Sequence, residues 1–241
     1  MKVATLVYGM YREFDIASKS WGFIENLDSD IYFSTWSQSK QYNKRLGILI
    51  DETVKEEQIL SKFPHANVSI LDDKDVELTN TQKMIFHWKN CLSMLEASGK
   101  EYNYLILTRP DNYVIFNHNK SDLEHKSAND RIYGLEEIKR DGEELFIQDI
   151  FFMGTYGCIS KLIRNLPSKN DINGFDGYIH HNLPKHILLN DMFVEKVNNL
   201  SVVTVRSNAR ELKEDEINVN NILKKTMEWG ENQSQYYEKN F

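Results

Sequence analysis

Short apolar runs alternate with amphipathic segments along the first half of the chain, and this alternation limits the fold more than any other sequence feature. Residues 81–97 place apolar side chains on one face at helical spacing, and the nearly all-apolar run 104–108 follows. Strands that alternate with helices form right-handed βαβ units. We therefore predict an α/β fold, with a mainly parallel central sheet flanked by helices. Its strands include residues 2–8, 30–33, 67–71 and 104–108.

The remaining segments are less regular. Their apolar spacing predicts helices over residues 13–27, 158–166 and 188–197, and a last strand over residues 201–205. Residues 37–45 are polar and predict a surface loop.

Residues that cap or end helices, and a change in polarity late in the chain, indicate the domain organisation. Asp51 and Thr53 supply capping chemistry for a helix that Pro64 ends. Beyond Arg206 the chain becomes polar and acidic. We predict one domain over residues 1–206 and a polar helical extension over residues 207–241.

Composition excludes several classes of protein. The chain has 36 Asp and Glu against 29 Lys and Arg, a formal net charge of -7. Because a non-specific nucleic-acid binder needs a basic surface, we expect no nucleic-acid partner. No stretch approaches the ~20 apolar residues of a membrane span. Cys91 and Cys158 lack CxxC spacing, which argues against a thiolate zinc site and favours the reduced core thiols of a cytoplasmic protein.

The most informative polar residues follow the predicted strand 104–108. Arg109, Asp111 and Asn112 come at its carboxyl end, where open α/β sheets bind their ligands. An arginine grips a phosphate through paired hydrogen bonds, and a carboxylate holds a divalent cation that bridges two phosphates. The alternative is an ordinary turn closed by an Arg–Asp pair.

Two other predicted strands end in candidate residues. Gly9 lets the backbone approach a ligand and Arg12 opens the next helix, which fits a phosphate or ribose contact. Thr35 and Trp36 fit a contact with a base by stacking, or else Trp36 belongs to the core. Since parallel strands end at one edge, we expect Gly9, Arg12, Thr35, Arg109 and Asp111 to line one cleft.

In order along the chain, these motifs resemble a known family. Residues 9–14 read Gly-Met-Tyr-Arg-Glu-Phe, residues 30–36 Asp-Ile-Tyr-Phe-Ser-Thr-Trp, and residues 149–154 Asp-Ile-Phe-Phe-Met-Gly. A helix with an early Gln82 precedes a strand that ends in Thr-Arg-Pro-Asp. The pattern is similar to that of the GT-A-type glycosyltransferase-like proteins of polysaccharide and lipopolysaccharide gene clusters and some large phages. The resemblance covers about residues 1–205 and implies a single GT-A-like, Rossmann-related domain that binds a nucleotide sugar.

The chain departs from that family at one place. GT-A enzymes carry Asp-x-Asp where this chain has Arg109, Pro110 and Asp111, and those carboxylates hold Mn²⁺ or Mg²⁺ on the diphosphate. A guanidinium neutralises diphosphate charge directly. Asp111 then either binds a metal more weakly or positions Arg109.

Two carboxylates are candidates for the base that deprotonates the acceptor hydroxyl. Asp191 follows Asn190 at the start of the predicted helix 188–197, which resembles the Glu-Asp pair of some inverting GT-A enzymes. The alternative for Asp191 is an acidic first-turn residue that complements the helix dipole. Asp149 is the competing candidate, because its motif also lies past a predicted strand.

The resemblance and the residues leave three functions open. The first is transfer of a sugar from a nucleotide-sugar donor to a glycan or similar hydroxyl acceptor. The second is a degenerate GT-A module that binds a nucleotide or glycan without turnover, which Arg109 favours. The third, a nucleotidyltransferase, lacks the support of a Gly-rich loop that contains Lys.

Overall fold

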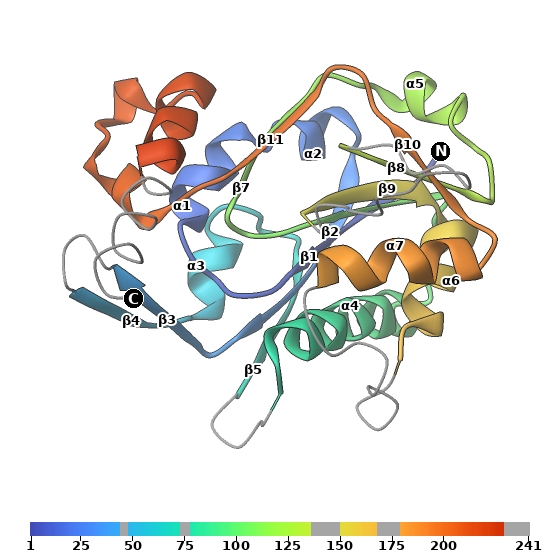
Figure 1. The fold of residues 1–241 in the computed structure, drawn as a ribbon, viewed down its shortest axis with the longest axis horizontal. Helices are drawn as coiled ribbons and strands as arrows, with labels where there is room; N and C mark the ends of the chain where they lie inside the picture. The colour runs from blue at the N-terminus through green and yellow to red at the C-terminus, as the bar shows by residue number, and fades with distance from the viewer. Residues whose placement is uncertain (44–47, 73–77, 136–149, 168–178, 229–241) are drawn as a thin grey trace.

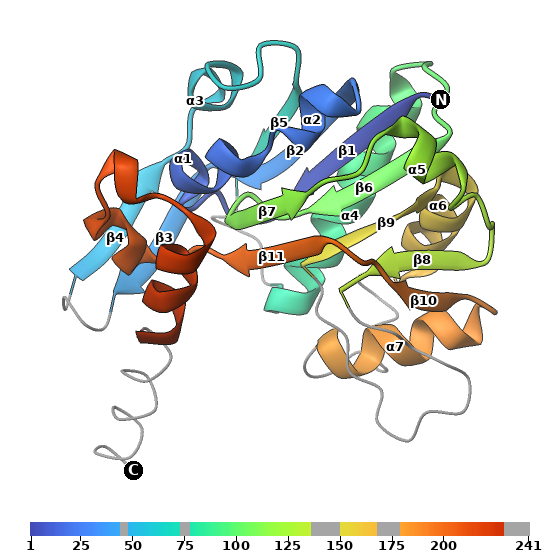
Figure 2. The same cartoon turned by 90° about the horizontal axis from the view of Figure 1, so that it is seen from above.

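The central sheet contains the four strands that the sequence predicts. The computed structural model describes residues 1–43, 48–72, 78–135, 150–167 and 179–228. In that part of the chain, seven strands form one sheet in the order β10-β8-β9-β6-β1-β2-β5 (Figure 1, Figure 2). Strand β1 (Val3–Tyr8) pairs parallel with β2 (Ser29–Trp36) and β6 (Tyr104–Thr108), and β5 (Asn67–Leu71) pairs parallel with β2.

The other half of the sheet contains one strand that runs opposite to the rest of the strands in the described part of the chain. Strand β9 (Phe151–Thr155) runs antiparallel to β6 and to β8 (Arg131–Gly134), and β10 (Phe193–Lys196) pairs parallel with β8. All the other strands therefore point the same way. The predicted α/β fold with a mainly parallel central sheet is confirmed.

Helices cover both faces of this sheet, so every residue of β1 is buried. Leu6 and Tyr8 face the core beneath α4 (Asn80–Ala97), α6 (Tyr156–Asn165) and α7 (Ile179–Leu189). Val3 and Val7 point to the other face and join the second core cluster. The period-2 alternation of a strand explains why β1 is apolar throughout.

Helix α4 is the longest described helix and confirms the prediction over residues 81–97. Thr79 and Gln82 form a capping box, in which the Gln82 amide donates to Thr79 Oγ1 and Gln82 Oε1 accepts from the Thr79 amide. The early glutamine of the sequence motif is therefore a helix cap. Trp88 and Cys91 of α4 are fully buried against the sheet.

Short elements cover the opposite face. They are α1 (Phe14–Ala17), η1 (Ser18–Ser20), α2 (Phe23–Asn26), α3 (Glu56–Leu60) and α5 (Lys120–Glu124). A two-stranded antiparallel ribbon of β7 (Asn112–Phe116) and β11 (Leu200–Thr204) lies beside them (Figure 2). The ribbon matters for function, because it returns the C-terminal part of the chain to the end of β6.

The chain beyond β11 packs on the N-terminal region. It comprises η3 (Ser207–Glu211), η4 (Glu214–Glu216) and helical residues 219–228. Val205, Ala209 and Ile222 bury Ala17 of α1 in a small third cluster. Figure 1 shows this segment beside α1 and the β3–β4 hairpin.

The polar stretch predicted as a surface loop over residues 37–45 is instead a hairpin strand. Strand β3 (Gln38–Asn43) pairs antiparallel with β4 (Ile48–Thr53). Backbone hydrogen bonds hold such a ribbon, so it needs no apolar run. The predicted capping by Asp51 and Thr53 is also wrong, because both belong to β4 and the N-cap of α3 is Lys55.

Two predicted helices differ from the structure. The helix over residues 13–27 is broken into α1, η1 and α2, with Glu13 before α1 in the left-handed region at φ 53°. The helix over residues 188–197 is wrong, because α7 ends at Leu189 and β10 follows. Asp191, at φ 55°, makes the turn between them. Sheet pairing with β8 overrides the helical spacing of that apolar segment.

Within the described ranges, we find no helix with the length and apolar character that crossing a membrane requires.

We predict that Gly9→Ala destabilises the fold by about 1–2 kcal/mol. Gly9 ends β1 at φ 107°, which L-residues rarely adopt, while an added Cβ meets nothing within 4 Å. The cost is therefore one of backbone strain. Urea denaturation of the variant and the wild type measures it.

The matched control is Gly157→Ala in α6. There an added Cβ first meets Asn129 Oδ1 at 3.7 Å, and the helix favours alanine. We expect unchanged or slightly increased stability. Equal losses in the two variants would contradict the role of the Gly9 backbone.

Candidate functional site

The loop after β1 is fixed in place by residues at the end of β2. The Gly9 amide donates to the Ser34 carbonyl at 3.1 Å, and the Tyr11 amide donates to Thr35 Oγ1 at 3.0 Å. Thr35 is fully buried. The structure thus brings Thr35 to the predicted edge as a residue that positions the loop carrying Arg12.

Arg12 meets the turn after β6. Its Nε donates to Asp111 Oδ2 at 2.7 Å. Arg109 Nε donates to Asp111 Oδ1 at 2.9 Å, and Arg109 Nη2 donates to Oδ2 at 2.7 Å. The predicted grouping of Gly9, Arg12, Thr35, Arg109 and Asp111 at the carboxyl edge is therefore present in the structure.

The turn itself is tied down by Asn112. Its side-chain Nδ2 donates to the Ile150 carbonyl at 2.6 Å and to Thr108 Oγ1 at 3.2 Å. Its backbone carbonyl accepts from Trp21 Nε1 at 2.8 Å. Asn112 is fully buried. It holds the end of β6, the start of β9 and the opposite face together, so Arg109 and Asp111 have little freedom to move.

A third arginine joins them from a distant part of the sequence. The Val205 amide, just after β11, donates to the Asp111 carbonyl at 2.7 Å, which places Arg206 beside the pair. Burial and the charges of Arg12 and Arg109 lower the pKa of Arg206 to about 10, although Asp111 raises it. We call Arg12, Arg109 and Arg206 around Asp111 the arginine cluster.

Sequence reasoning missed Arg206. It directly follows the predicted strand 201–205, so the rule that polar residues at strand ends approach ligands points to it. That rule applies to parallel strands, however, and β11 pairs antiparallel with β7. Only the ribbon that brings β11 against the Asp111 turn decides its position.

The electrostatics of the cluster favour an anion. Three guanidinium groups lie around the buried carboxylate of Asp111, so the cluster is rich in positively charged side chains. The side chains of Arg12 and Arg109 are 23% and 22% exposed, while that of Asp111 is 1% exposed. A ligand therefore reaches the cations, and the carboxylate lies behind them.

Asp111 is ionised despite its burial. Burial raises the pKa of Asp111, but the charges of Arg109 and Arg12 and their hydrogen bonds lower it more, to about 2. Both of its oxygens are engaged by guanidinium groups. The described residues also hold no group of three or more His, Cys, Asp or Glu that fits a metal ion.

Among the described residues, the surroundings of Asp111 therefore do not favour a divalent cation. Three neighbouring guanidinium groups repel Mg²⁺ or Mn²⁺, and hydrogen bonds from Arg12 and Arg109 already engage both carboxylate oxygens. In this geometry Asp111 positions the arginines, which is one of the two roles expected from the sequence.

The remaining predicted residues lie elsewhere. Asp191 precedes β10 at the amino edge of the sheet, because Phe193 pairs with Arg131 and both strands run parallel to β6. The structure therefore does not bring Asp191 to the arginine cluster.

Trp36 is 3% exposed and stacks on Phe86 at 5.6 Å between ring centroids, so it occupies the core position that was the alternative for this residue. Asp149 lies outside the described residues.

The similarity of this chain to known proteins concerns its fold. No family model matches the sequence, and no curated protein matches it. Among solved structures, the fold is similar to that of the nucleoside-diphosphate-sugar pyrophosphorylase from Vibrio cholerae RC9, with a TM-score of 0.41 and 9% sequence identity. That match covers 82% of this chain and 93% of the other.

We predict that Asp111→Asn costs about 3 kcal/mol of stability, because it removes the buried carboxylate that neutralises the partly buried guanidinium groups of Arg12 and Arg109. The control is Asp28→Asn, which removes an exposed ion pair with Lys120 at 3.2 Å. Asp28 is 91% exposed, so its loss costs at most about 1 kcal/mol. Chemical denaturation at pH 7 compares the two, and equal losses would contradict the central place of Asp111.

We also predict the pH range over which Asp111 acts. Its folded pKa of about 2 lies below the ~3.9 of an unfolded aspartate, so its ionisation stabilises the fold by about 2–3 kcal/mol above pH ~4. That contribution is lost as the pH falls from about 4 to about 2. The unfolding free energy of Asp111→Asn should accordingly fall less steeply than that of the wild type in this interval.

Proposed function

We propose that the chain is a glycosyltransferase that moves a sugar from a nucleotide-sugar donor to a glycan or similar hydroxyl acceptor. The observation that carries the proposal is the arginine cluster at the carboxyl edge of the sheet, where the partly exposed guanidinium groups of Arg12 and Arg109 lie beside Arg206 and suit an anion. The resemblance of the strand-end motifs to the GT-A-type family supports the sugar-transfer chemistry.

In this proposal the diphosphate of the donor binds to Arg12 and Arg109, with Arg206 as the third cation. Planar guanidinium groups pair with phosphate oxygens, and Asp111 fixes two of them before the ligand arrives. When the sugar leaves, negative charge grows on the diphosphate. Preorganised cations stabilise that charge in the transition state without reorganisation.

Two parts of the proposal rest on the sequence. Asp149 remains the candidate base for the acceptor hydroxyl, since Asp191 is at the opposite edge of the sheet. Asp149 precedes Ile150, whose carbonyl accepts from Asn112 beside the arginine cluster. Dependence on Mn²⁺ or Mg²⁺ also stays a prediction, although the geometry of Asp111 favours guanidinium neutralisation.

A second candidate function is a module that binds a nucleotide or glycan without turnover. One specific observation favours it: Arg109 replaces an acidic ligand of the family, and Asp111 is fully engaged by arginines. Both functions use the same anion site. They differ only in whether the sugar–phosphate bond is broken.

We predict that Arg109→Ala weakens binding of UDP and of inorganic pyrophosphate by roughly 10- to 150-fold, because a charge-assisted contact contributes about 1.5–3 kcal/mol. Arg109→Lys should recover only part of the affinity, since it keeps the charge and loses the planar fork. Calorimetric titration, with and without Mn²⁺, measures both.

Asp111→Asn separates its two roles in the same titration. If Asp111 is a metal ligand, nucleotide binding by the variant should no longer depend on Mn²⁺. If Asp111 positions the arginines, the variant should bind the nucleotide more weakly with or without metal. The control is Arg131→Ala, whose ion pair with Glu195 lies at the surface of β8 and β10. Unchanged affinity in Arg109→Ala would remove the diphosphate role.

Turnover distinguishes the enzyme from the binding module. We expect the wild type to hydrolyse at least one of a panel of nucleotide sugars (UDP-, GDP-, dTDP-, CMP- and ADP-sugars), slowly in the absence of an acceptor. Arg109→Ala should abolish that hydrolysis, and Arg131→Ala should not change it. Tight binding of a nucleotide diphosphate with no turnover of any donor, with or without Mn²⁺, would favour the module.

A further inference from the structure

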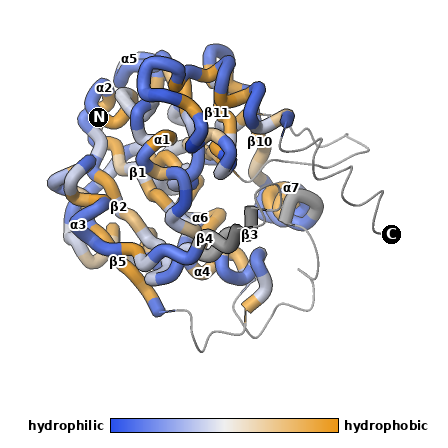
Figure 3. Tube along the Cα trace, turned by 90° about the vertical axis from the view of Figure 1, so that its left-hand side faces the viewer, coloured by the Kyte–Doolittle hydropathy of each residue, from blue (hydrophilic) through white to orange (hydrophobic). Residues whose placement is uncertain are grey.

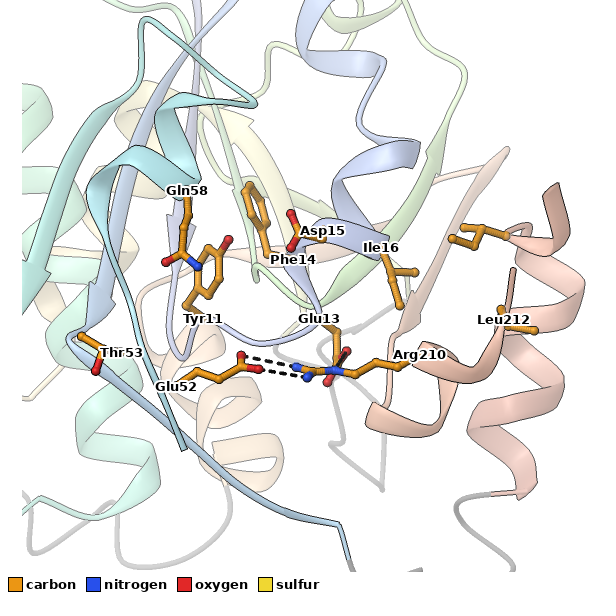
Figure 4. A pocket seen from close by; sticks show the side chains of 11 residues that line it. Tyr11, Glu13, Phe14, Asp15, Ile16, Glu52, Thr53, Gln58, Arg210 and Leu212 are labelled. Carbon is orange, nitrogen blue, oxygen red and sulfur yellow. Dashed lines mark hydrogen bonds and ion pairs between the residues drawn. The ribbon is translucent and has the colours of Figure 1, made fainter. Parts of the chain in front are cut away.

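A cavity lies beside the arginine cluster, on the other side of the loop after β1. Its volume is about 640 Å³, within the range of ligand sites in proteins. Tyr11, Glu13 and Phe14 form one wall, Glu52 of β4 another, and Arg210 of η3 a third (Figure 4). The cavity is thus built from three segments that are distant in sequence.

Two polar atoms at its wall lack partners. Glu13 Oε1 and Tyr11 Oη are buried and make no hydrogen bond within the described residues. The side chain of Glu13 is 1% exposed, and its other oxygen accepts from Arg210 Nε at 2.8 Å. Buried polar groups are nearly always hydrogen-bonded, and an unsatisfied one costs stability. Each of the two atoms has less than 1 Å² exposed, so a ligand would satisfy them only by displacing the side chains that cover them.

The cavity differs in charge from the arginine cluster. Its lining presents the carboxylates of Glu13, Asp15 and Glu52 against the guanidinium of Arg210, and Lys62, outside the lining, pairs with Asp15 at 3.6 Å, which leaves one carboxylate in formal excess. Arg210 also pairs with Glu52 at 3.0 Å, so one cation serves two carboxylates. The formal excess of negative charge disfavours a phosphate or a uronic acid and favours a ligand that donates several hydrogen bonds.

The pKa values agree with this polarity. Burial raises the pKa of Glu13, against the lowering effect of Arg210. Burial, with the charges of Asp15 and Glu52, also raises the pKa of Tyr11, so its hydroxyl stays protonated. A protonated hydroxyl can both donate and accept a hydrogen bond.

We propose that this cavity binds an uncharged saccharide, whose hydroxyl groups donate to the carboxylates and pair with Tyr11 Oη. A disaccharide offers more hydroxyl donors to the three carboxylates than a nucleobase, which offers one to three N–H groups. Arg210 is 40% exposed and donates to both Glu13 and Glu52, so a saccharide that reaches Glu13 must replace the hydrogen bonds of this side chain. If the proposed function is right, on which this reading of the ligand rests, the saccharide is the acceptor.

The test uses two tyrosines that share one property. Tyr11→Phe and Tyr104→Phe each remove a buried hydroxyl without a partner in the described structure. Neither change should destabilise the protein, because no hydrogen bond is lost. Tyr104 lies on β6 in the core, away from the cavity lining, and so controls for the general effect of removing a buried hydroxyl.

We expect maltose, lactose, cellobiose or N,N′-diacetylchitobiose to bind the wild type in an NMR titration, and glucuronic acid not to bind. Tyr11→Phe should weaken the binding roughly 2- to 10-fold, the range of one net hydrogen bond. Tyr104→Phe should leave it unchanged, and Glu13→Gln should weaken it further than Tyr11→Phe does.

Three outcomes would overturn the proposal: no neutral disaccharide binds, the affinity is equal in Tyr11→Phe and the wild type, or uridine binds here in preference to the sugars. Pyrophosphate titration of the same samples separates this result from the proposed function. Pyrophosphate binding without saccharide binding rejects the cavity proposal alone. Saccharide binding without pyrophosphate binding rejects the diphosphate site and leaves the cavity.

Discussion

The ion pairs of one buried carboxylate, Asp111, organise the carboxyl edge of this protein. Asp111 is 1% exposed, and its oxygens are shared by Arg109 from its own turn and Arg12 from the loop after β1. Its backbone carbonyl accepts from Val205, which brings the end of β11 to the same point. Breaking a buried ion pair leaves charges that water cannot reach, so these three segments hold their relative positions strongly.

That arrangement also gives the site its chemistry. Arg12 and Arg109 are partly exposed beside the buried Asp111, so positively charged side chains are accessible to an anion at this edge of the sheet. Both oxygens of Asp111 accept hydrogen bonds from these guanidinium groups, which explains why Asp111 holds them in position.

The loop after β1 connects two sites of opposite polarity. Arg12 points to the arginine cluster, and its neighbours Tyr11 and Glu13 line the cavity closed by Arg210. Both the cluster and the cavity draw on the segment from Gly9 to Phe14, and both include a residue beyond β11: Arg206 for the cluster and Arg210 for the cavity.

Local sequence patterns predict the α/β class, four parallel strands of the sheet and helix α4. They also predict the grouping of Arg12, Arg109 and Asp111. These follow from local periodicity and from the rule that parallel strands end at one edge. The sequence did not determine β3 and β4, the turn at Asp191 or the positions of Arg206 and Arg210. Antiparallel pairing depends on which segments meet, and a polar strand such as β3 carries no apolar signal. The return of the chain after β11 to the loop after β1 is visible only in the folded structure. It depends on contacts such as the ion pair of Arg210 with Glu13, and residues 197 positions apart leave no local pattern in the sequence.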